Sequence, residues 1–144
     1  MRIKRVIKWI HGLITAGLLL IVIGFVWLNH PSDQRESDVL QSSYHIDDNL
    51  WLYATRNDSG GATVATVYRY YLATQLPGND RKKIRELNKL TPFMEGYGTI
   101  SSVARKADNL LKVVYSGEVL SLDDTAHYSA NGAPVTIKLS YQIN

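Results

Sequence analysis

The sequence predicts an N-terminal transmembrane helix followed by a small, mostly antiparallel β (α+β) domain of about five strands and one helix. Three observations lead to this fold class. A long uncharged apolar run occupies residues 12–28. After it, several segments alternate apolar and polar side chains, which is the pattern of half-buried strands. A single segment, residues 81–90, repeats apolar side chains at a helical spacing.

The apolar run has the length and composition of a membrane anchor. Seventeen residues of helix cover about 26 Å, slightly less than a hydrocarbon core of ~30 Å. Extending the helix back to Val6 supplies the missing length. Trp9 and Trp27 then fall near the two ends, where aromatic rings favour the interface with water. We therefore expect residues 1–29 to form a cytoplasmic basic flank and a transmembrane anchor.

The charges that flank this run predict its orientation. The first thirty residues contain no acidic side chain and four basic ones, Arg2, Lys4, Arg5 and Lys8. The flank after the run mixes Arg35 with three acids. Because basic flanks stay in the cytoplasm, the domain should lie on the other side of the membrane. A cleaved signal peptide is the alternative, but the bulky sequence Phe-Val-Trp-Leu-Asn-His at the end of the run lacks the small residues of a cleavage site.

The charge and cysteine content exclude several classes of function. The overall pI of 9.1 comes from the basic flank. The residues after the first thirty carry twelve Lys and Arg against thirteen Asp and Glu, a formal charge of −1. A nearly neutral domain gives no support to nucleic-acid binding. The absence of cysteine excludes a disulfide framework, a thiol nucleophile and a lipidated cysteine.

The remainder divides into a tether and a domain. Residues 30–43 are polar and contain a proline, so we expect a short tether there, followed by a domain at 44–144. The turn-forming sequence Asn-Asp-Ser-Gly-Gly joins the first two strands as a hairpin. Residues 123–134 are expected to be a polar loop. The strands are expected at residues 50–56, 62–72, 98–103, 110–122 and 135–143.

No catalytic or cofactor-binding motif is present. The sequence has no Gly-x-Ser-x-Gly, no His-Glu-x-x-His and no phosphate-binding loop. His45 with Asp47 and Asp48 is the nearest approach to a metal-ligating group, but a solvated loop before a strand explains these residues equally well. We therefore expect a non-enzymatic protein without a cofactor.

The second strand of the expected hairpin offers one candidate binding surface. Alternation sends Tyr70 to one face and its neighbours Arg69 and Tyr71 to the other. Exposed tyrosine and arginine side chains are favoured at protein interfaces. We predict that Arg69 and Tyr71 are an exposed pair that binds a partner, with Tyr70 in the core. The alternative is a central strand that is covered on both faces.

The single helix of the domain offers a second candidate surface. Arg81, Arg85 and Lys89 recur every four residues, which places them in one stripe of a helix that spans residues 81–90. Such a stripe suits anionic lipid headgroups or an acidic protein. The alternative is a solvated helix face opposite the apolar side chains, supported by a Lys82–Glu86 pair.

The segment Asp58-Ser59-Gly60-Gly61-Ala62-Thr63, behind a single anchor, resembles small bacterial single-pass or lipoprotein-type periplasmic proteins that carry a Gly-Gly-Ala-Thr hairpin. Proteins of this build include immunity proteins of contact-dependent and type VI secretion toxins. The resemblance transfers no functional residue. It implies a bacterial inner-membrane location with the domain in the periplasm.

The expected function is therefore a membrane-tethered periplasmic protein-binding module. Its specific form would be an immunity-type inhibitor of a secreted toxin, since a tether keeps an inhibitor at the surface where such a toxin acts. The alternative is a structural or accessory subunit of an inner-membrane envelope complex. The expected partners are a protein, and membrane lipid through the N-terminal helix, but not nucleic acid.

The predicted orientation is tested with reporter fusions after Asn144. A reporter that is active only in the periplasm should be active there, because the basic flank holds the N-terminus in the cytoplasm. A reporter that is active only in the cytoplasm should be silent at the same position. The opposite pattern would contradict the orientation and the periplasmic location together.

Overall fold

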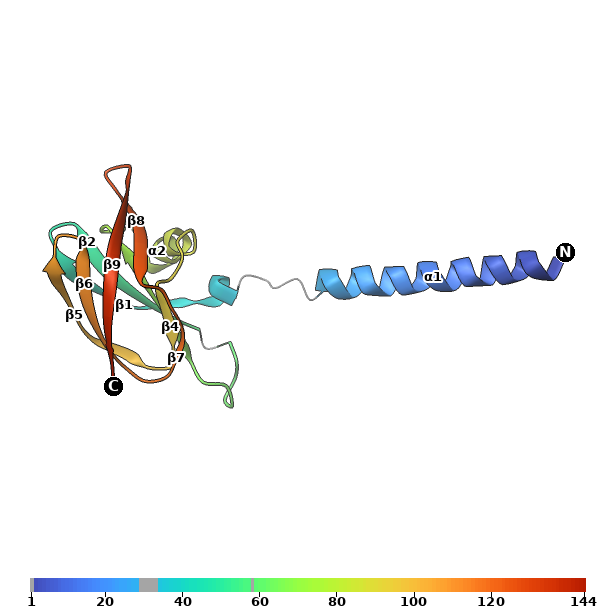
Figure 1. The fold of residues 1–144 in the computed structure, drawn as a ribbon, viewed down its shortest axis with the longest axis horizontal. Helices are drawn as coiled ribbons and strands as arrows, with labels where there is room; N and C mark the ends of the chain where they lie inside the picture. Colours follow the sequence, from blue (N-terminus) through green and yellow to red (C-terminus); the bar gives the residue numbers. More distant parts are fainter. Residues whose placement is uncertain (1, 29–33, 58) are drawn as a thin grey trace. The chain divides into compact units, whose positions relative to one another are not determined.

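The computed structural model describes residues 2–28, 34–57 and 59–144. The chain divides into a helical unit, Met1–Asp33, and a compact unit, Gln34–Asn144 (Figure 1). The apolar helix followed by an α+β domain confirms the predicted fold class. The described part of the domain contains nine strands, more than the five that were expected.

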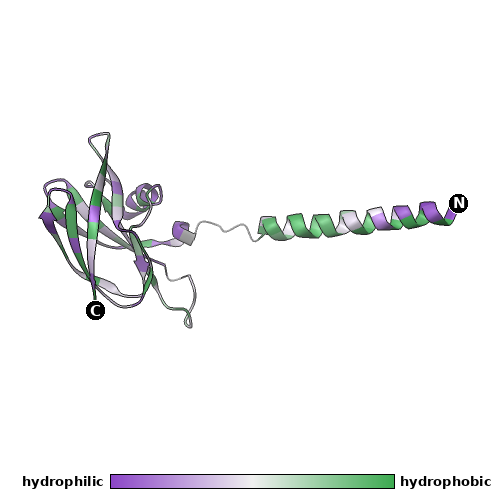
Figure 2. Cartoon of the chain, in the orientation of Figure 1, coloured by the Kyte–Doolittle hydropathy of each residue, from purple (hydrophilic) through white to green (hydrophobic). Residues whose placement is uncertain are grey.

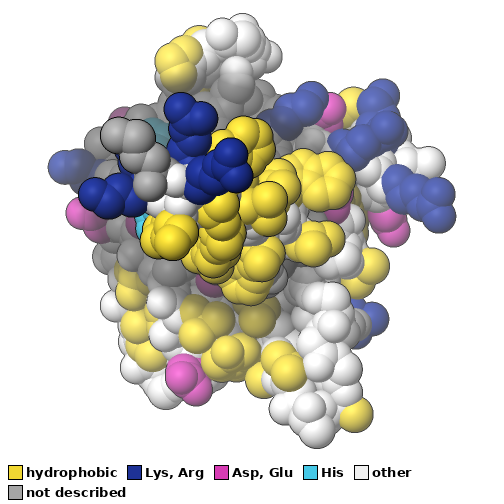
Figure 3. Space-filling view, turned by 90° about the vertical axis from the view of Figure 1, so that its right-hand side faces the viewer, with side chains coloured by type: hydrophobic (Ala, Val, Ile, Leu, Met, Phe, Trp, Pro, Cys, Tyr) yellow, Lys and Arg dark blue, Asp and Glu magenta, His cyan; other side chains and the backbone are white. Residues whose placement is uncertain are grey.

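Helix α1 (Arg2–Leu28) is long and apolar enough to span a membrane. Twenty-seven residues of helix extend for about 40 Å, which exceeds a hydrocarbon core of about 30 Å. Hydropathy along the helix rises from its basic N-terminal turns toward Leu28 (Figure 2). The space-filling view toward its N-terminal end shows hydrophobic side chains gathered around it, with Lys and Arg beside them (Figure 3). The apolar anchor helix predicted from the sequence is thus present.

The compact unit is built from two sheets and one α-helix. The first sheet has the order β1-β2-β3-β4-β7, and the second has the order β5-β6-β9-β8. Neighbouring strands are antiparallel except β6 and β9, which are parallel. The elements are η1 (Gln34–Ser37), β1 (Val39–Asp47), β2 (Leu50–Asn57), β3 (Val67–Ala73), α2 (Asp80–Leu87), β4 (Met94–Gly96), β5 (Thr99–Ala107), β6 (Leu110–Ser116), β7 (Val119–Leu122), β8 (Thr125–Ala130) and β9 (Ala133–Ile143).

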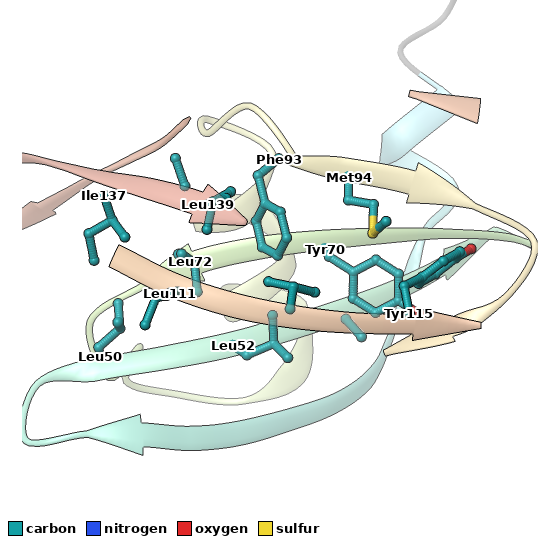
Figure 4. Close-up of a cluster of buried hydrophobic side chains, with 13 residues drawn as sticks. Leu50, Leu52, Tyr70, Leu72, Phe93, Met94, Leu111, Tyr115, Ile137 and Leu139 are labelled. Atoms are coloured by element: carbon teal, nitrogen blue, oxygen red, sulfur yellow. The ribbon is translucent and has the colours of Figure 1, made fainter. Parts of the chain in front are cut away.

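The main core lies between the two sheets, where side chains of β2 and β3 meet those of β6 and β9 (Figure 4). Within it, the rings of Tyr70 and Tyr115 make an edge-to-face contact with centroids 6.2 Å apart. Such a contact stabilises beyond its buried area. The largest buried apolar side chains of this core are Leu50, Leu52, Tyr70, Leu72, Phe93, Met94, Leu111, Tyr115, Ile137 and Leu139.

Helix α2 covers the other face of the first sheet. Asn79 caps the helix by accepting a hydrogen bond from the Lys82 amide at 3.0 Å. Leu87 packs with Tyr53 and Tyr71 in a second apolar cluster. Strands β2 and β3 are therefore covered on both faces, which explains why most of their residues are buried and the others half-buried.

The expected tether was partly wrong. Its residues 30–33 lie outside the described part of the chain, but Val39–Asp47 form β1 and pair with β2. The strand was missed because Gln41, Ser42 and Ser43 interrupt its apolar alternation. These polar residues are tolerated because β1 is an edge strand, whose side chains are largely exposed.

The expected loop at 123–134 was also wrong, because it contains β8 and its turn to β9. Asn131 and Gly132 have positive φ angles of 51° and 78°, as a two-residue hairpin turn between twisted strands requires. A second difference concerns residues 110–122, which form two strands in different sheets. Gly117, with φ of 127°, makes the break, and a Cβ there would lie 2.5 Å from the Gly98 Cα. The second strand of the hairpin begins at Val67 rather than at residue 62.

A buried ionic network joins Asp38, directly before β1, to side chains of β2 and β3. Both oxygens of the Asp38 carboxylate accept from the Arg69 guanidinium, at 2.7 and 2.8 Å. The same carboxylate accepts from Thr55 at 2.9 Å and from Asn57 at 2.8 Å. The Arg69 Nε atom is 3.1 Å from Glu95. Each carboxylate oxygen of Asp38 thus accepts hydrogen bonds, which offsets the loss of water around the buried charge.

We expect Arg69→Met to lower the free energy of unfolding by about 3–5 kcal/mol, because it leaves the Asp38 carboxylate buried without its countercharge. Chemical denaturation of the detergent-solubilised protein, followed by the near-ultraviolet dichroism of its tyrosines, measures this effect. Arg105→Met is the matched control, since it breaks an ion pair whose side chains are 30% and 37% exposed. Equal effects of the two substitutions would show that burial does not set the strength of the Arg69 pair.

Candidate functional site

A hollow of the compact unit lies between two edge strands. Strand β1 is at the edge of the first sheet and β5 is at the edge of the second. Between them is a groove of about 480 Å³, which we call the serine groove. Its volume falls in the range of about 300–1,000 Å³ that small-ligand sites occupy.

The serine groove has an apolar floor and hydroxyl-bearing walls. The floor consists of Leu52, Ala54, Tyr68 and Tyr70, which come from β2 and β3. No lining residue is an acid, a base or a histidine, so the groove is suited to an uncharged ligand with hydrogen-bonding groups. The walls are Gln41, Ser42, Ser43 and Tyr44 of β1 and Thr99, Ile100, Ser101, Ser102 and Val103 of β5.

Each wall of the groove contains a β-bulge at the third residue of its strand. The pairing of β1 with β2 shifts between Leu40 and Ser42, so Gln41 is an extra residue. The pairing of β5 with β6 shifts between Ile100 and Ser102, so Ser101 is the extra residue. Such bulges re-aim side chains and bend an edge strand. They account for the runs of consecutive residues, rather than alternate ones, that line the groove.

One ion pair joins the two walls beyond the serines. The Arg105 guanidinium of β5 donates to the Asp47 carboxylate of β1 and also to the Asp108 carbonyl. Asp47 accepts a further hydrogen bond from the Asp48 amide at 2.8 Å. This backbone hydrogen bond and the Arg105 guanidinium lower the pKa of Asp47 below its ordinary value of 3.8. The pair therefore bridges the two sheets at neutral pH.

Tyr70, one of the two tyrosines of the floor, is held in its neutral state. The Tyr70 hydroxyl donates to the Gly98 carbonyl at 2.9 Å, and the Gly98 amide donates to the Tyr115 hydroxyl at 2.7 Å. Burial raises the pKa of Tyr70 to about 12. This hydroxyl therefore stays protonated near neutral pH, and its role in the groove is to shape the floor.

The prediction that Arg69 and Tyr71 are an exposed pair was wrong. Their exposed fractions are 7% and 1%, and both lie on the face of β3 that α2 covers. Arg69 is occupied by Asp38 and Glu95. Burial raises the pKa of Tyr71 to about 12, so its hydroxyl stays neutral. The strand matches the alternative, a central strand covered on both sides.

The basic stripe is only partly formed. Arg81 and Arg85 are exposed on α2, but the helix ends at Leu87, and Lys89 lies in the turn that follows. The Lys89 ammonium pairs with Glu86 at 2.9 Å. This pair takes the place of the expected Lys82–Glu86 pair. The three cations still lie close together along the chain, at the exposed side and the end of one helix.

Of the three residues considered as metal ligands, His45 and Asp47 lie in β1, and Asp48 lies in the turn that follows. The ring of His45 packs against Trp51 with centroids 5.0 Å apart, and Asp47 contacts Arg105. Among the described residues, no group of three or more His, Asp or Glu side chains is arranged to hold a metal ion.

The sequence did not reveal the serine groove, because its first wall was assigned to the tether. The strand-forming residues Tyr44, His45 and Ile46, directly before a turn and a second strand, were the available signal for β1. No protein family, curated protein or solved structure matches the chain. The chemistry of the groove is therefore argued from its own residues.

The ion pair between Asp47 and Arg105 leads to a prediction about the pKa of Asp47. Because the pKa of Asp47 is lowered by folding, its contribution to stability is complete above the unfolded value of 3.8 and is lost as the pH falls through the folded pKa. Arg105→Gln should raise the pKa of Asp47 toward, but not to, the ordinary value, since the Asp48 amide remains. A carboxyl titration by NMR measures this shift, with Lys112→Gln as the control. An unchanged pKa in Arg105→Gln would contradict the bridge.

Proposed function

We propose that this protein is a membrane-tethered periplasmic binding module, and that the serine groove holds an extended segment of a protein partner. The observation that supports this most directly is the position of the groove between two open edge strands. An edge strand presents unpaired amide and carbonyl groups, which an added peptide strand can use. Here two such edges flank one apolar floor.

The lining of the groove favours a peptide over a charged metabolite. Main-chain groups of an added strand supply affinity, while alternate side chains enter pockets. The floor of Leu52, Ala54 and Tyr68 suits an apolar side chain of the partner. The serine hydroxyls can donate to and accept from its backbone. An anionic or cationic ligand would find no countercharge among the lining residues.

The charged side chains that discourage pairing at the edge of β5 lie away from the groove, whereas the bulges at Gln41 and Ser101 lie within it. Natural proteins discourage strand pairing at sheet edges with charges and bulges. On β5 the charged residues Arg105 and Lys106 lie beyond Val103, where the groove lining ends. The stretch of β5 that lines the groove carries uncharged side chains instead. This arrangement leaves a short uncharged length of the β5 edge for a partner.

The absence of a proton-transfer pair in the lining supports binding rather than catalysis as the role of the groove. The specific form that we propose is an immunity-type inhibitor, in which the groove captures a segment of a secreted toxin in the periplasm. The anchor would hold the inhibitor at the membrane surface and raise its local concentration there. The basic flank of α1 supports the periplasmic placement of the domain.

Filling the groove tests the proposal. Ser102→Trp should weaken capture of the partner by at least about tenfold, equivalent to ~1.4 kcal/mol, because the new ring occupies the space of the peptide. The melting temperature should stay within a few degrees, since Ser102 is exposed. A photocrosslinking residue at Ser43 in intact cells identifies the partner by mass spectrometry.

Ser129→Trp is the matched control, because Ser129 is exposed on β8, the edge strand at the opposite side of the second sheet. It should not change capture. Equal capture by both tryptophan variants would overturn the assignment of the groove. A crosslinked envelope-complex subunit in place of a toxin would retain the groove but replace the immunity role.

A further inference from the structure

We propose that the exposed basic face of α2 docks on the anionic phospholipid headgroups of the membrane that holds α1. This surface is distinct from the serine groove; the inference rests on the membrane tether of the proposed function and not on the partner of the groove. The residues that form it, which we call the α2 basic face, are Arg81, Lys82, Lys83, Arg85 and Lys89.

The charged residues of the domain are distributed unevenly along the chain. Five of the twelve Lys and Arg residues that follow the first thirty residues lie within positions 81–89. Residues 80–89 carry a formal charge of +3, while the rest of this part of the chain carries −4. An anionic surface would attract the first region and repel the second. The separation of charge thus favours one orientation of the domain over a negatively charged membrane.

The fold presents these cations outward. Ile84 and Leu87 are buried, which turns the opposite side of α2 to the solvent. Arg81, Lys82 and Arg85 are exposed on that side. Among the described residues, only Lys89 of this face forms a salt bridge, and its partner Glu86 is itself on the helix. The exposed cations Arg81, Lys82 and Arg85 therefore remain available for headgroup phosphates, with the half-buried Lys83 beside them.

The start of the compact unit lies directly beside the end of α2. The Arg35 guanidinium donates to the Leu90 carbonyl at 3.2 Å, and the side-chain amide of Asn88 donates to the Arg35 carbonyl at 3.2 Å. These two hydrogen bonds join η1 to the turn that contains Lys89. The segment of the domain that is nearest in sequence to the anchor is thus adjacent to the basic face.

The connection to the anchor is short. The five residues between Leu28 and Gln34 can span at most about 20 Å, whatever their path. With α1 in the membrane, this length of chain keeps Gln34, the first residue of η1, within about 20 Å of the end of α1. An acidic protein partner would have to arrive by diffusion, whereas the headgroups are present continuously. This permanent proximity is the reason for choosing lipid as the occupant.

The test uses the full chain in lipid nanodiscs. Since the chain has no cysteine, Thr91→Cys provides a single labelling site on an exposed residue just beyond the basic face. Energy transfer from this label to an acceptor on the lipid headgroups reports proximity. We expect higher transfer in discs that contain phosphatidylglycerol than in purely phosphatidylcholine discs. The difference should disappear at high salt, because headgroup attraction is screened.

Arg81→Glu/Arg85→Glu should abolish the difference between the two lipid compositions. Lys106→Glu/Lys138→Glu, which changes the net charge equally at exposed positions of the second sheet, should preserve it. Unchanged melting temperatures would establish that both variants are folded. Transfer that is independent of lipid charge would overturn the proposal, as would an equal loss in the two variants.

Discussion

The buried contact between Arg69 and Asp38 is the interaction on which the arrangement of the domain depends. Asp38 directly precedes β1, and Arg69 lies in the central strand β3. The contact therefore brings the chain that leaves the anchor onto the first sheet and positions it to pair with β2. Burial of an ion pair is expensive, and it is sustained here because Thr55 and Asn57 satisfy the remaining capacity of the carboxylate.

The position of β1 has two consequences for the surface. It makes β1 the edge strand that faces β5, and so creates one wall of the serine groove. It also sets η1 against the end of α2 through Arg35 and Asn88. One wall of the serine groove and the place of η1 beside α2 thus depend on the same contact between Arg69 and Asp38. In the proposals above, the groove binds a protein segment while the helix face meets lipid.

The hydrophobic pattern of the sequence was sufficient to predict those elements whose own residues show it. The apolar run of α1, the aromatic alternation of β2 and the alternation of β9 each predict their structure, because one face of each is uniformly apolar. Pattern failed for β1 and β8, which lie at sheet edges; the side chains of β1 are mainly exposed, and those of β8 are mostly half-buried or exposed. Edge strands need little apolar surface, so their pairing depends on a neighbour that the local sequence does not reveal.

The same distinction explains the candidate sites. The sequence by itself determined the anchor helix, the α+β class and the concentration of basic residues near positions 81–89, because composition and period express these directly. Tertiary structure alone decided that Arg69 and Tyr71 are buried, since only the packing of α2 on β3 covers that face. It alone created the serine groove, because the two walls lie more than fifty residues apart and meet only when both sheets are assembled.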